Sequence, residues 1–243
     1  MIRLFRYELY KLRRTRLLWL VAIAPLFMVF QGVQNFVRYR QIWTREAWEV
    51  IMEQTFIFYP SFLYPLLIAV IMAMVARVDH VQGGWKYMLA HPVSRSGIYM
   101  AKLAAGILYI LISMAAFGIS VVMGGLIAGA GGSIPWGEIA WKMAGCFLAS
   151  LPVIMIQYEL SMRFSHIGVP LAASIIMSVP SILVANSKQF WLFDPWTYPI
   201  VLLLGSRLDM DDGQSVIMNI IIVVLTLLVF LIGMLGFRRR DIV

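Results

Sequence analysis

The side chains best suited to catalysis or metal binding are few in this sequence and lie far apart. The three histidines, His80, His91 and His166, do not form a His-Glu-x-x-His pattern, and no paired aspartates accompany them. Cys146 is the single cysteine, so an intramolecular disulfide is excluded. It lies in an apolar run, which favours a small buried residue. We therefore expect no catalytic residue and no metal site.

The sequence also lacks the loop that binds nucleotide phosphates. That loop needs Gly-x-x-x-x-Gly-Lys-Ser/Thr, because backbone amides and one lysine hold the phosphates together. The glycine-rich run at 124–133 contains no lysine, and its Gly125-x-x-x-Gly129 spacing favours close helix packing, within one chain or between two copies. We expect no cofactor in this chain and no ATPase activity of its own, so ATP and Mg²⁺ would bind a partner.

A charged pair lies near the end of one apolar stretch. Glu159 and Arg163 are four residues apart, a spacing that favours an ion pair on a helix surface. Charges at membrane depth are otherwise candidates for function. Because this pair would lie at the membrane boundary, where charge costs little, the plain helix-surface pair is the favoured interpretation.

The elements that carry these residues are long and apolar. Hydrophobic residues make up 61% of the 243 residues and charged residues only 13%, against roughly 25% charged residues in soluble domains. A bilayer core needs about 20 apolar residues in a helix. Six stretches reach about that length: 17–33, 55–75, 103–128, 143–160, 167–184 and 216–235. The sequence predicts an all-α polytopic membrane protein with six transmembrane helices, forming a single domain over 1–243.

The basic residues predict the orientation. Most of the 20 Lys and Arg residues lie in segments that share a side with the N-terminus, whereas most acidic residues lie on the other side. Cytoplasmic segments carry the excess of Lys and Arg, so we expect both termini in the cytoplasm of a cell with this protein in its plasma membrane. The net charge of +8 then reflects topology and attraction to inner-leaflet lipid. Nucleic acid is not an expected partner.

The N-terminal segment, 1–16, has its own helical pattern. Ile2, Phe5, Leu9 and Leu12 recur at helical spacing, with arginines elsewhere around the helix. This pattern predicts an interfacial helix with its apolar stripe in lipid and its basic side on the headgroups. An ordinary cytoplasmic extension of the first span is the alternative.

The segment at 78–97, between the second and third predicted spans, is the most informative. Gly83 and the glycine after it can end the incoming helix, and Pro92 ends the next one. Between them, three apolar residues recur at i, i+3 and i+4: Trp85, Met88 and Leu89. A short amphipathic helix of this kind suits binding by a soluble partner, although a helix lying on the membrane surface without a partner has the same periodicity.

This segment resembles the first cytoplasmic loop of ABC transporter permeases of the type-2, export-like family. There an acidic residue, a Gly-Thr pair, an apolar run and a Pro-x-Ser-Arg ending recur. The matching positions are Asp79, Gly83-Gly84, Trp85 to Leu89, and Pro92 to Arg95. The basic stretch at 237–242, the predicted six spans and the N-terminal interfacial helix also match. Asp79 stands where glutamate is usual, and Gly84 where threonine is usual.

The resemblance implies that two permease subunits, identical or different, pair in the lipid membrane. Each would dock a cytoplasmic ABC ATPase subunit through the loop helix, here a short cytoplasmic coupling helix. The residues assigned to ATPase coupling are Asp79, Gly83, Trp85, Lys86, Met88, Leu89, Pro92 and Arg95. Three of them supply apolar contacts to the ATPase (Trp85, Met88 and Leu89). Lys86 and Arg95 form a charged rim, and Asp79 anchors the loop, with the basic N-terminal helix as its candidate partner.

Within that family, the chain is most similar to permeases that protect Gram-positive bacteria from lantibiotics and related peptides. The similarity rests on 83–86, 92–95 and 193–196. We expect a bacterial exporter of antimicrobial peptides or other amphiphiles. A permease for a lipid or small drug, and a sensor or scaffold that recruits a cytoplasmic partner, are the alternatives.

The segment at 186–215 is expected on the extracytoplasmic side. Its aromatic residues suit the headgroup region, and the resemblance implies that 200–205 turns back into the membrane. Candidate contacts for a cationic peptide are Trp191, Trp196, Asp209, Asp211 and Asp212.

Overall fold

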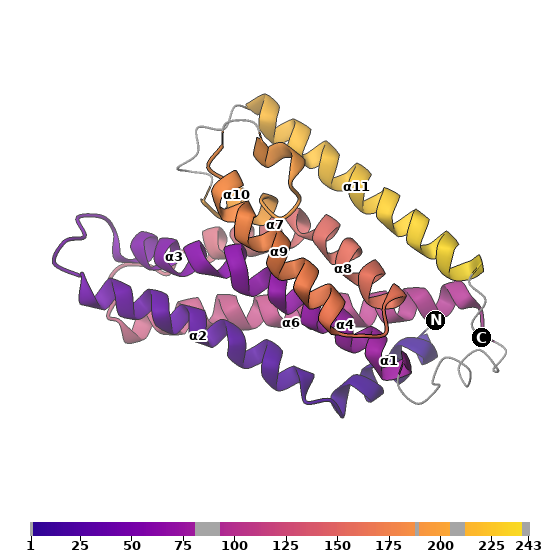
Figure 1. Cartoon of the computed structure of the whole chain (residues 1–243). Coiled ribbons are helices and arrows are strands. Elements are labelled where there is room, and N and C mark those ends of the chain that lie inside the picture. The colour runs from indigo at the N-terminus through magenta and orange to yellow at the C-terminus, as the bar shows by residue number, and fades with distance from the viewer. Residues whose placement is uncertain (1, 81–92, 188–189, 205–211, 240–243) are drawn as a thin grey trace.

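The computed structural model describes residues 2–80, 93–187, 190–204 and 212–239 (Figure 1). All regular elements in these residues are helical, which confirms the all-α prediction for the described part of the chain. In chain order they are α1 (Ile2–Arg13), α2 (Leu17–Arg38), α3 (Ala47–Phe58), η1 (Tyr59–Leu63), α4 (Tyr64–His80), α6 (Arg95–Ile127), α7 (Trp136–Ala149), α8 (Leu151–Arg163), α9 (Gly168–Val184), η3 (Phe190–Phe193), α10 (Tyr198–Leu204) and α11 (Asp212–Arg239).

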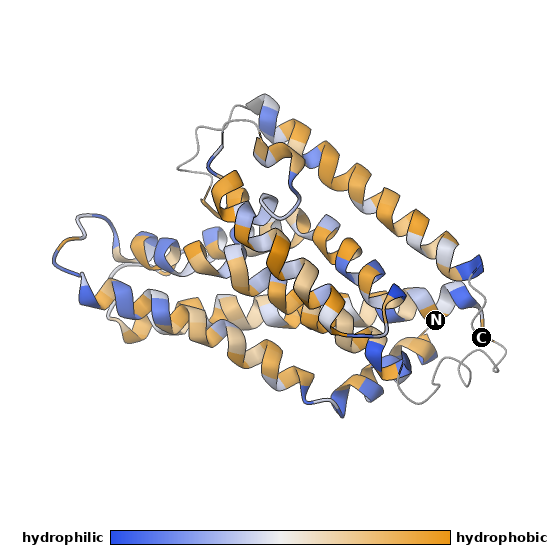
Figure 2. Cartoon of the chain, in the orientation of Figure 1, coloured by the Kyte–Doolittle hydropathy of each residue, from blue (hydrophilic) through white to orange (hydrophobic). Residues whose placement is uncertain are grey.

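Several of these helices are long and apolar enough to cross a membrane. Within the described residues, four stretches qualify alone: Leu17–Arg38, Ala47–His80, Arg95–Ile127 and Gly213–Arg239. The bent pair of α7 and α8 adds a fifth if it is one span, and α9 is a shorter apolar helix of 17 residues. Apolar residues fill the middle of the bundle and hydrophilic ones gather towards its ends (Figure 2). The chain is a multi-pass membrane protein with four to five candidate spans, and the sixth stays a prediction.

Two predicted spans are interrupted where they were expected to be continuous. The stretch at 143–160 is divided between α7 and α8, which meet at an angle of 45° beside Ser150. Pro152 lies just after this bend, and proline lacks the N–H that a continuous helix would use there. The Ala47–His80 stretch contains a turn of π-helix, η1, which includes Pro60. The Tyr64 hydroxyl, directly after η1, lies 2.8 Å from the Ser150 hydroxyl and joins the two irregular points.

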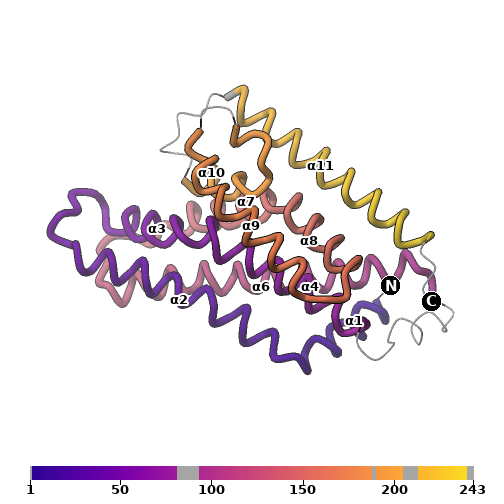
Figure 3. Tube along the Cα trace, in the orientation of Figure 1, coloured from indigo at the N-terminus to yellow at the C-terminus, as the bar shows by residue number. Residues whose placement is uncertain are grey.

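The core lies between the long helices α2, α4, α6 and α8. α2 packs along α6, and α4 packs along α8. Aromatic rings fill the space beside η1: Tyr59 stacks on Phe117 with ring centroids 3.7 Å apart and on Tyr64 at 5.3 Å. By contrast, α9 and α11 lie on the outside of the bundle and expose rows of apolar side chains (Figures 1 and 3). Such faces suit contact with lipid.

The glycine-rich end of α6 is packed within the chain. A Cβ atom on Gly125 would come within 2.3 Å of the Trp48 ring, and one on Gly124 within 2.8 Å of Val33. α6 therefore approaches α2 and α3 at distances that only glycine allows at these two positions. The close packing predicted for this stretch is confirmed at Gly125 inside one chain but not at Gly129, which follows the end of α6 and where a Cβ atom would meet only Arg40 at 3.9 Å. A contact between two copies stays a prediction.

Candidate functional site

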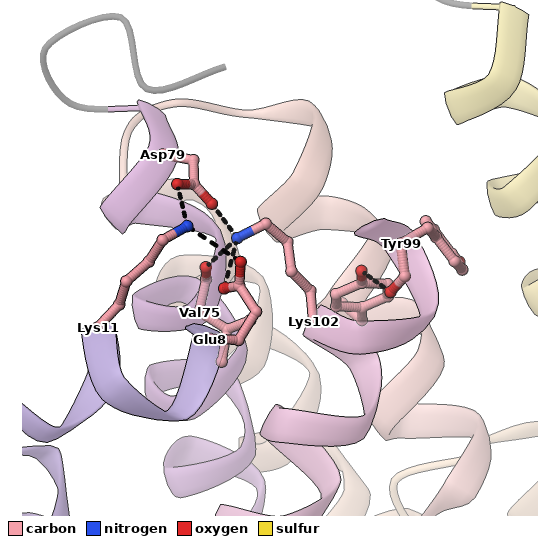
Figure 4. A network of polar contacts seen from close by, with 7 residues as sticks. Glu8, Lys11, Val75, Asp79, Tyr99 and Lys102 are labelled. Atoms are coloured by element: carbon pink, nitrogen blue, oxygen red, sulfur yellow. Dashed lines mark hydrogen bonds and ion pairs between the residues drawn. The ribbon is translucent and has the colours of Figure 1, made fainter. Parts of the chain in front are cut away.

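Four charged side chains meet at the end of the bundle where α1 begins and α11 ends (Figures 1 and 4). The Lys11 ammonium group of α1 donates to Asp79 Oδ1 at 2.7 Å and to Glu8 Oε1 at 3.0 Å. Lys102 of α6 lies 3.0 Å from Glu8 Oε2 and also pairs with Asp79. We call Glu8, Lys11, Asp79 and Lys102 the ion cluster.

The ion cluster is buried and balanced in charge. Glu8 and Asp79 are each 3% exposed, and Lys102 is fully buried. Removing charges from water costs several kcal/mol per ion, so they persist only when each is paired and hydrogen-bonded. Two carboxylates and two ammonium groups meet that condition, and Lys102 makes a further hydrogen bond to the Val75 carbonyl oxygen at 3.2 Å.

The pKa of Lys11 reflects a balance between burial and its two acidic partners. Burial alone would lower the pKa of its ammonium group, but the hydrogen bond to Asp79 and the negative charges of Glu8 and Asp79 outweigh that effect. The pKa of Lys11 is therefore raised above its ordinary value of 10.5. Its charge is held by the partners that also hold Lys102.

Three helices supply the ion cluster, and their positions explain its importance. Glu8 and Lys11 are three residues apart on α1, Asp79 is in the last turn of α4, and Lys102 is near the start of α6. α4 ends immediately before 81–92, and α6 begins shortly after it. The cluster thus ties α1 to the helices on both sides of the segment that was predicted to couple to an ATPase.

The orientation of α1 differs from the prediction. Glu8 and Leu12 are buried, and Phe5 and Leu9 pack against the core, so most of the predicted lipid-facing stripe faces the protein. The reason is that the ion pair of Glu8 with Lys102 turns this side of α1 inwards. Ile2 is the one exposed member of the predicted stripe, and Tyr7 and Tyr10 are the other exposed large hydrophobic side chains of α1.

Two of the predicted coupling residues are described. Asp79 does contact a basic residue of the N-terminal helix, namely Lys11. Arg95 donates from Nη1 to the Arg238 carbonyl oxygen at 3.0 Å and so joins the start of α6 to the end of α11. The remaining predicted residues lie outside the described residues: Gly83, Trp85, Lys86, Met88, Leu89 and Pro92. Coupling to an ATPase stays a prediction for all of them.

Glu159 does more than pair with Arg163. The ion pair is present, with Nε and Oε2 3.8 Å apart, but the Tyr99 hydroxyl also donates to the Glu159 carboxylate. The carboxylate lies directly against Gly233 of α11, where a Cβ atom would meet it at 1.8 Å. Glu159 therefore links α6, α8 and α11 beside a cavity of about 300 Å³.

The two tryptophans predicted to contact a substrate on the extracytoplasmic side are buried. Trp191 and Trp196 are buried at 3% and 6% exposure, so they are core residues of the described structure, while Phe190 and Phe193 are exposed beside them. Asp194 fixes this turn, accepting from the Ser181 hydroxyl at 2.6 Å and from the Trp196 backbone N–H at 3.0 Å.

Of the three acidic residues predicted to contact a substrate, the structure describes one. Asp212 is the first residue of α11, whereas Asp209 and Asp211 lie outside the described residues. The short helix α10 is apolar and largely buried, and it packs against α7 and α3. That α10 turns back into the membrane stays a prediction. Substrate contact by the two tryptophans and three aspartates also stays a prediction.

Glu8 and Lys102 were not identified from the sequence as site residues. A signal existed for each: Glu8 is the one acidic residue of α1, and Lys102 stands between apolar residues near the start of α6. Isolated charges in such positions need a partner, but the sequence does not show which charge is near which.

The fold and the ion cluster define a helical membrane protein whose N-terminal helix is tied to two spans at one end. The sequence profile of the ABC-2 family transporter protein matches residues 4–181, a range that contains the whole cluster. The chain therefore belongs to the ABC-2 transporter family. Membership makes it a membrane component of an ABC transporter and implies an ATPase partner. No curated protein matches the chain.

Proposed function

We propose that this chain is the permease subunit of an ATP-driven exporter that removes antimicrobial peptides or similar amphiphiles from a bacterial plasma membrane. It spans the membrane six times, with α7 and α8 as one span, α9 as another, and both chain ends in the cytoplasm. It pairs with a second permease subunit, identical or different, and each docks one cytoplasmic ATPase.

The observation that carries this proposal is the ion cluster. A permease must transmit movement of the docked ATPase to its spans, and an ATPase at 81–92 would push on α4 and α6 directly. Lys11 of α1 pairs with Asp79 of α4, and Glu8 of α1 pairs with Lys102 of α6. Both contacts are 3.0 Å or shorter, and both carboxylates are buried. Because the cluster is buried and fully paired, the three helix ends move as one unit.

The proposed cargo rests on the sequence resemblance and on the exposed apolar faces. The lantibiotic-like pieces at 83–86, 92–95 and 193–196 support a peptide, and the lipid-facing rows of α9 and α11 place the protein where amphiphiles accumulate. A lipid or small drug remains the alternative cargo, and a sensor or scaffold that recruits another cytoplasmic protein remains the alternative function.

Co-purification tests the proposal. The tagged full chain is isolated from its native membranes in mild detergent, and the recovered proteins are identified by mass spectrometry and assayed for ATP hydrolysis. We expect the intact chain to recover an ABC ATPase in a fixed ratio, and the W85D/L89D variant to lose it. I42D is the matched control, because Ile42 is exposed in the loop at the opposite end of the bundle.

The outcomes separate the candidate functions. Loss of the ATPase from W85D/L89D but not from I42D supports the permease and places the docking site at 81–92. Recovery of no ATPase by the folded, intact chain rejects the permease. Recovery of another cytoplasmic protein in its place supports the sensor or scaffold.

A further inference from the structure

A cavity lies at the opposite end of the bundle from the ion cluster, beside the start of α3 (Figure 1). Its volume is about 800 Å³, within the range of roughly 300–1,000 Å³ typical of small-molecule sites. The start of α3, the loop before α7, the first turns of α7 and the end of α10 line it. We call it the α3–α7 cavity.

The lining of the α3–α7 cavity combines apolar and acidic side chains. Trp48, Met52 and Leu202 supply apolar surface. Four carboxylates line it as well, against two cationic groups: Glu46, Glu49, Glu53 and Glu138, with Arg45 and Lys142. The cavity therefore carries two more negative than positive side chains.

The cationic groups are held by particular carboxylates. Arg45 lies 2.7 Å from Glu53 and 3.5 Å from Glu49, and Lys142 lies 2.9 Å from Glu138. Glu46 makes no ion pair with any residue that the structure describes. Glu49 is the more weakly paired partner of Arg45, and its side chain is 56% exposed. The excess negative charge thus lies on Glu46 and Glu49, which line the cavity together with apolar side chains.

Trp48 carries an unsatisfied hydrogen-bond donor next to the cavity. The residue is 5% exposed and lines the cavity, yet its indole Nε1 has no hydrogen-bond partner among the described residues. Buried Trp N–H groups usually have a partner, since leaving one unsatisfied costs about 1–3 kcal/mol. The Nε1 atom is itself buried, so a molecule in the cavity can accept this hydrogen bond only if the ring turns towards it.

We propose that the α3–α7 cavity binds a cationic amphiphile, whose apolar part contacts Trp48, Met52 and Leu202 and whose positive charge lies against Glu46 and Glu49. The three properties that carry the assignment are volume, the apolar wall and the unbalanced negative charge. As a site for cargo, the cavity rests on the proposed function. Binding itself does not, because it needs no ATPase.

A direct binding measurement tests this assignment. The full chain is placed in phosphatidylcholine nanodiscs without an ATPase, and the probe is the peptide dansyl-Leu-Lys-Leu-Lys-Leu-amide. Its matched neutral analogue has glutamine at both lysine positions. Fluorescence anisotropy is compared with that in protein-free nanodiscs, so that partition into lipid is subtracted.

Charge variants give effects of opposite sign. We expect saturable binding of the cationic probe that weakens roughly three- to tenfold in E46Q/E49Q, since each exposed pair contributes only a modest amount. K142Q, which removes a competing cation, strengthens binding of the same probe. The neutral analogue responds to neither variant. The charge-dependent part also declines as salt is raised from 0.05 to 0.5 M.

Three results would overturn the assignment. They are binding no stronger than in protein-free nanodiscs, equal binding of both probes, or no response to E46Q/E49Q in a variant that elutes as the folded protein. In each case the acidic residues serve only to stabilise the N-terminal turns of α3 and α7, where Glu46, Glu49 and Glu138 lie.

The same measurements keep the two proposals apart. A chain that binds the cationic probe but recovers no ATPase supports the cavity and rejects the permease. A chain that recovers an ATPase but does not bind the probe keeps the permease and rejects the cavity.

Discussion

Glu8 and Lys102 are separated by 94 positions in the sequence, yet Glu8 Oε2 and Lys102 Nζ lie 3.0 Å apart inside the protein. This contact fixes which side of α1 faces the bundle. It also means that α1, which its sequence pattern assigns to the membrane surface, is held to the bundle by a specific buried interaction.

Removing Lys102 should destabilise the fold strongly. K102M leaves Glu8 and Asp79 with Lys11 alone, and breaking a buried pair by deleting one partner costs about 3–5 kcal/mol. The free energy of unfolding in detergent measures this loss. E8Q/K102M removes one charge of each sign, so we expect it to be more stable than K102M. A double variant that is less stable than the single one would contradict this account.

The stability of the protein should decline in alkaline solution, in part through Lys11. The folded-state pKa of Lys11 lies above the ordinary value of 10.5, so its charge contributes stability that is fully present below pH 10.5. That contribution is lost as pH rises through the folded-state pKa. Thermal unfolding between pH 8 and 11.5 measures the decline, and K11M should show lower stability at pH 8 and a shallower fall above pH 10.5. An unchanged slope in K11M would reject the assignment.

Gly233 and Gly236 form a matched pair on α11. G233A forces the Glu159 carboxylate to rotate away, which breaks its hydrogen bond with Tyr99, whereas a Cβ atom at Gly236 meets nothing within 4 Å. We expect G233A to lower the free energy of unfolding by about 1–3 kcal/mol. G236A should be neutral or stabilising by up to about 1 kcal/mol, because alanine favours the helix.

The mechanism for G233A has its own control. In a Y99F background the hydrogen bond is already absent, so G233A should cost less there than in the unmodified chain. Equal costs in both backgrounds would show that Tyr99 plays no part.

The hydrogen bond between Tyr64 and Ser150 should couple the π-helical turn to the bend between α7 and α8. Hydrogen bonds between membrane helices contribute about 0.6 kcal/mol on average in double-mutant cycles. We expect Y64F and S150A to show a coupling energy of about this size in unfolding measurements. Additive effects of the two substitutions would show that the two irregular points are independent.

Much of the fold could be predicted from the sequence, because the apolar stretches are long. Four of the six predicted spans correspond to helices of full membrane length, and their ends differ by some residues because polar flanking turns continue the helices. The bend at Ser150 could not be predicted: a proline near a helix start, such as Pro152, and one inside a helix, such as Pro25 in α2, look alike in sequence. Pro25 is accommodated without dividing α2.

Of the candidate site, the sequence predicted only the residue that a local pattern marks. Asp79 was identified by its place before the glycine pair, and a basic partner on the N-terminal helix was expected for it. Glu8 and Lys102 depend on how three helices pack, and no local pattern encodes that. The same applies to Trp191, which clusters with residues of α10 and α11, and to Trp196, which packs into the main core of the bundle.

The π-helical turn at Tyr59–Leu63 has a consequence for the register of the whole Ala47–His80 stretch. A π-helical turn accommodates one residue more than an α-helical turn, and each residue of an α-helix advances about 100° around the axis. Deleting a single residue within 59–63 would therefore restore a regular α-helical turn and leave α3 facing α6 as it does now, with Trp48 beside Gly125 and Asp79 beside Lys102. If the turn became α-helical without a deletion, all of α3 would rotate by roughly 100° relative to α4, and Trp48 would leave Gly125. The surplus residue thus sets the register between the two ends of this stretch.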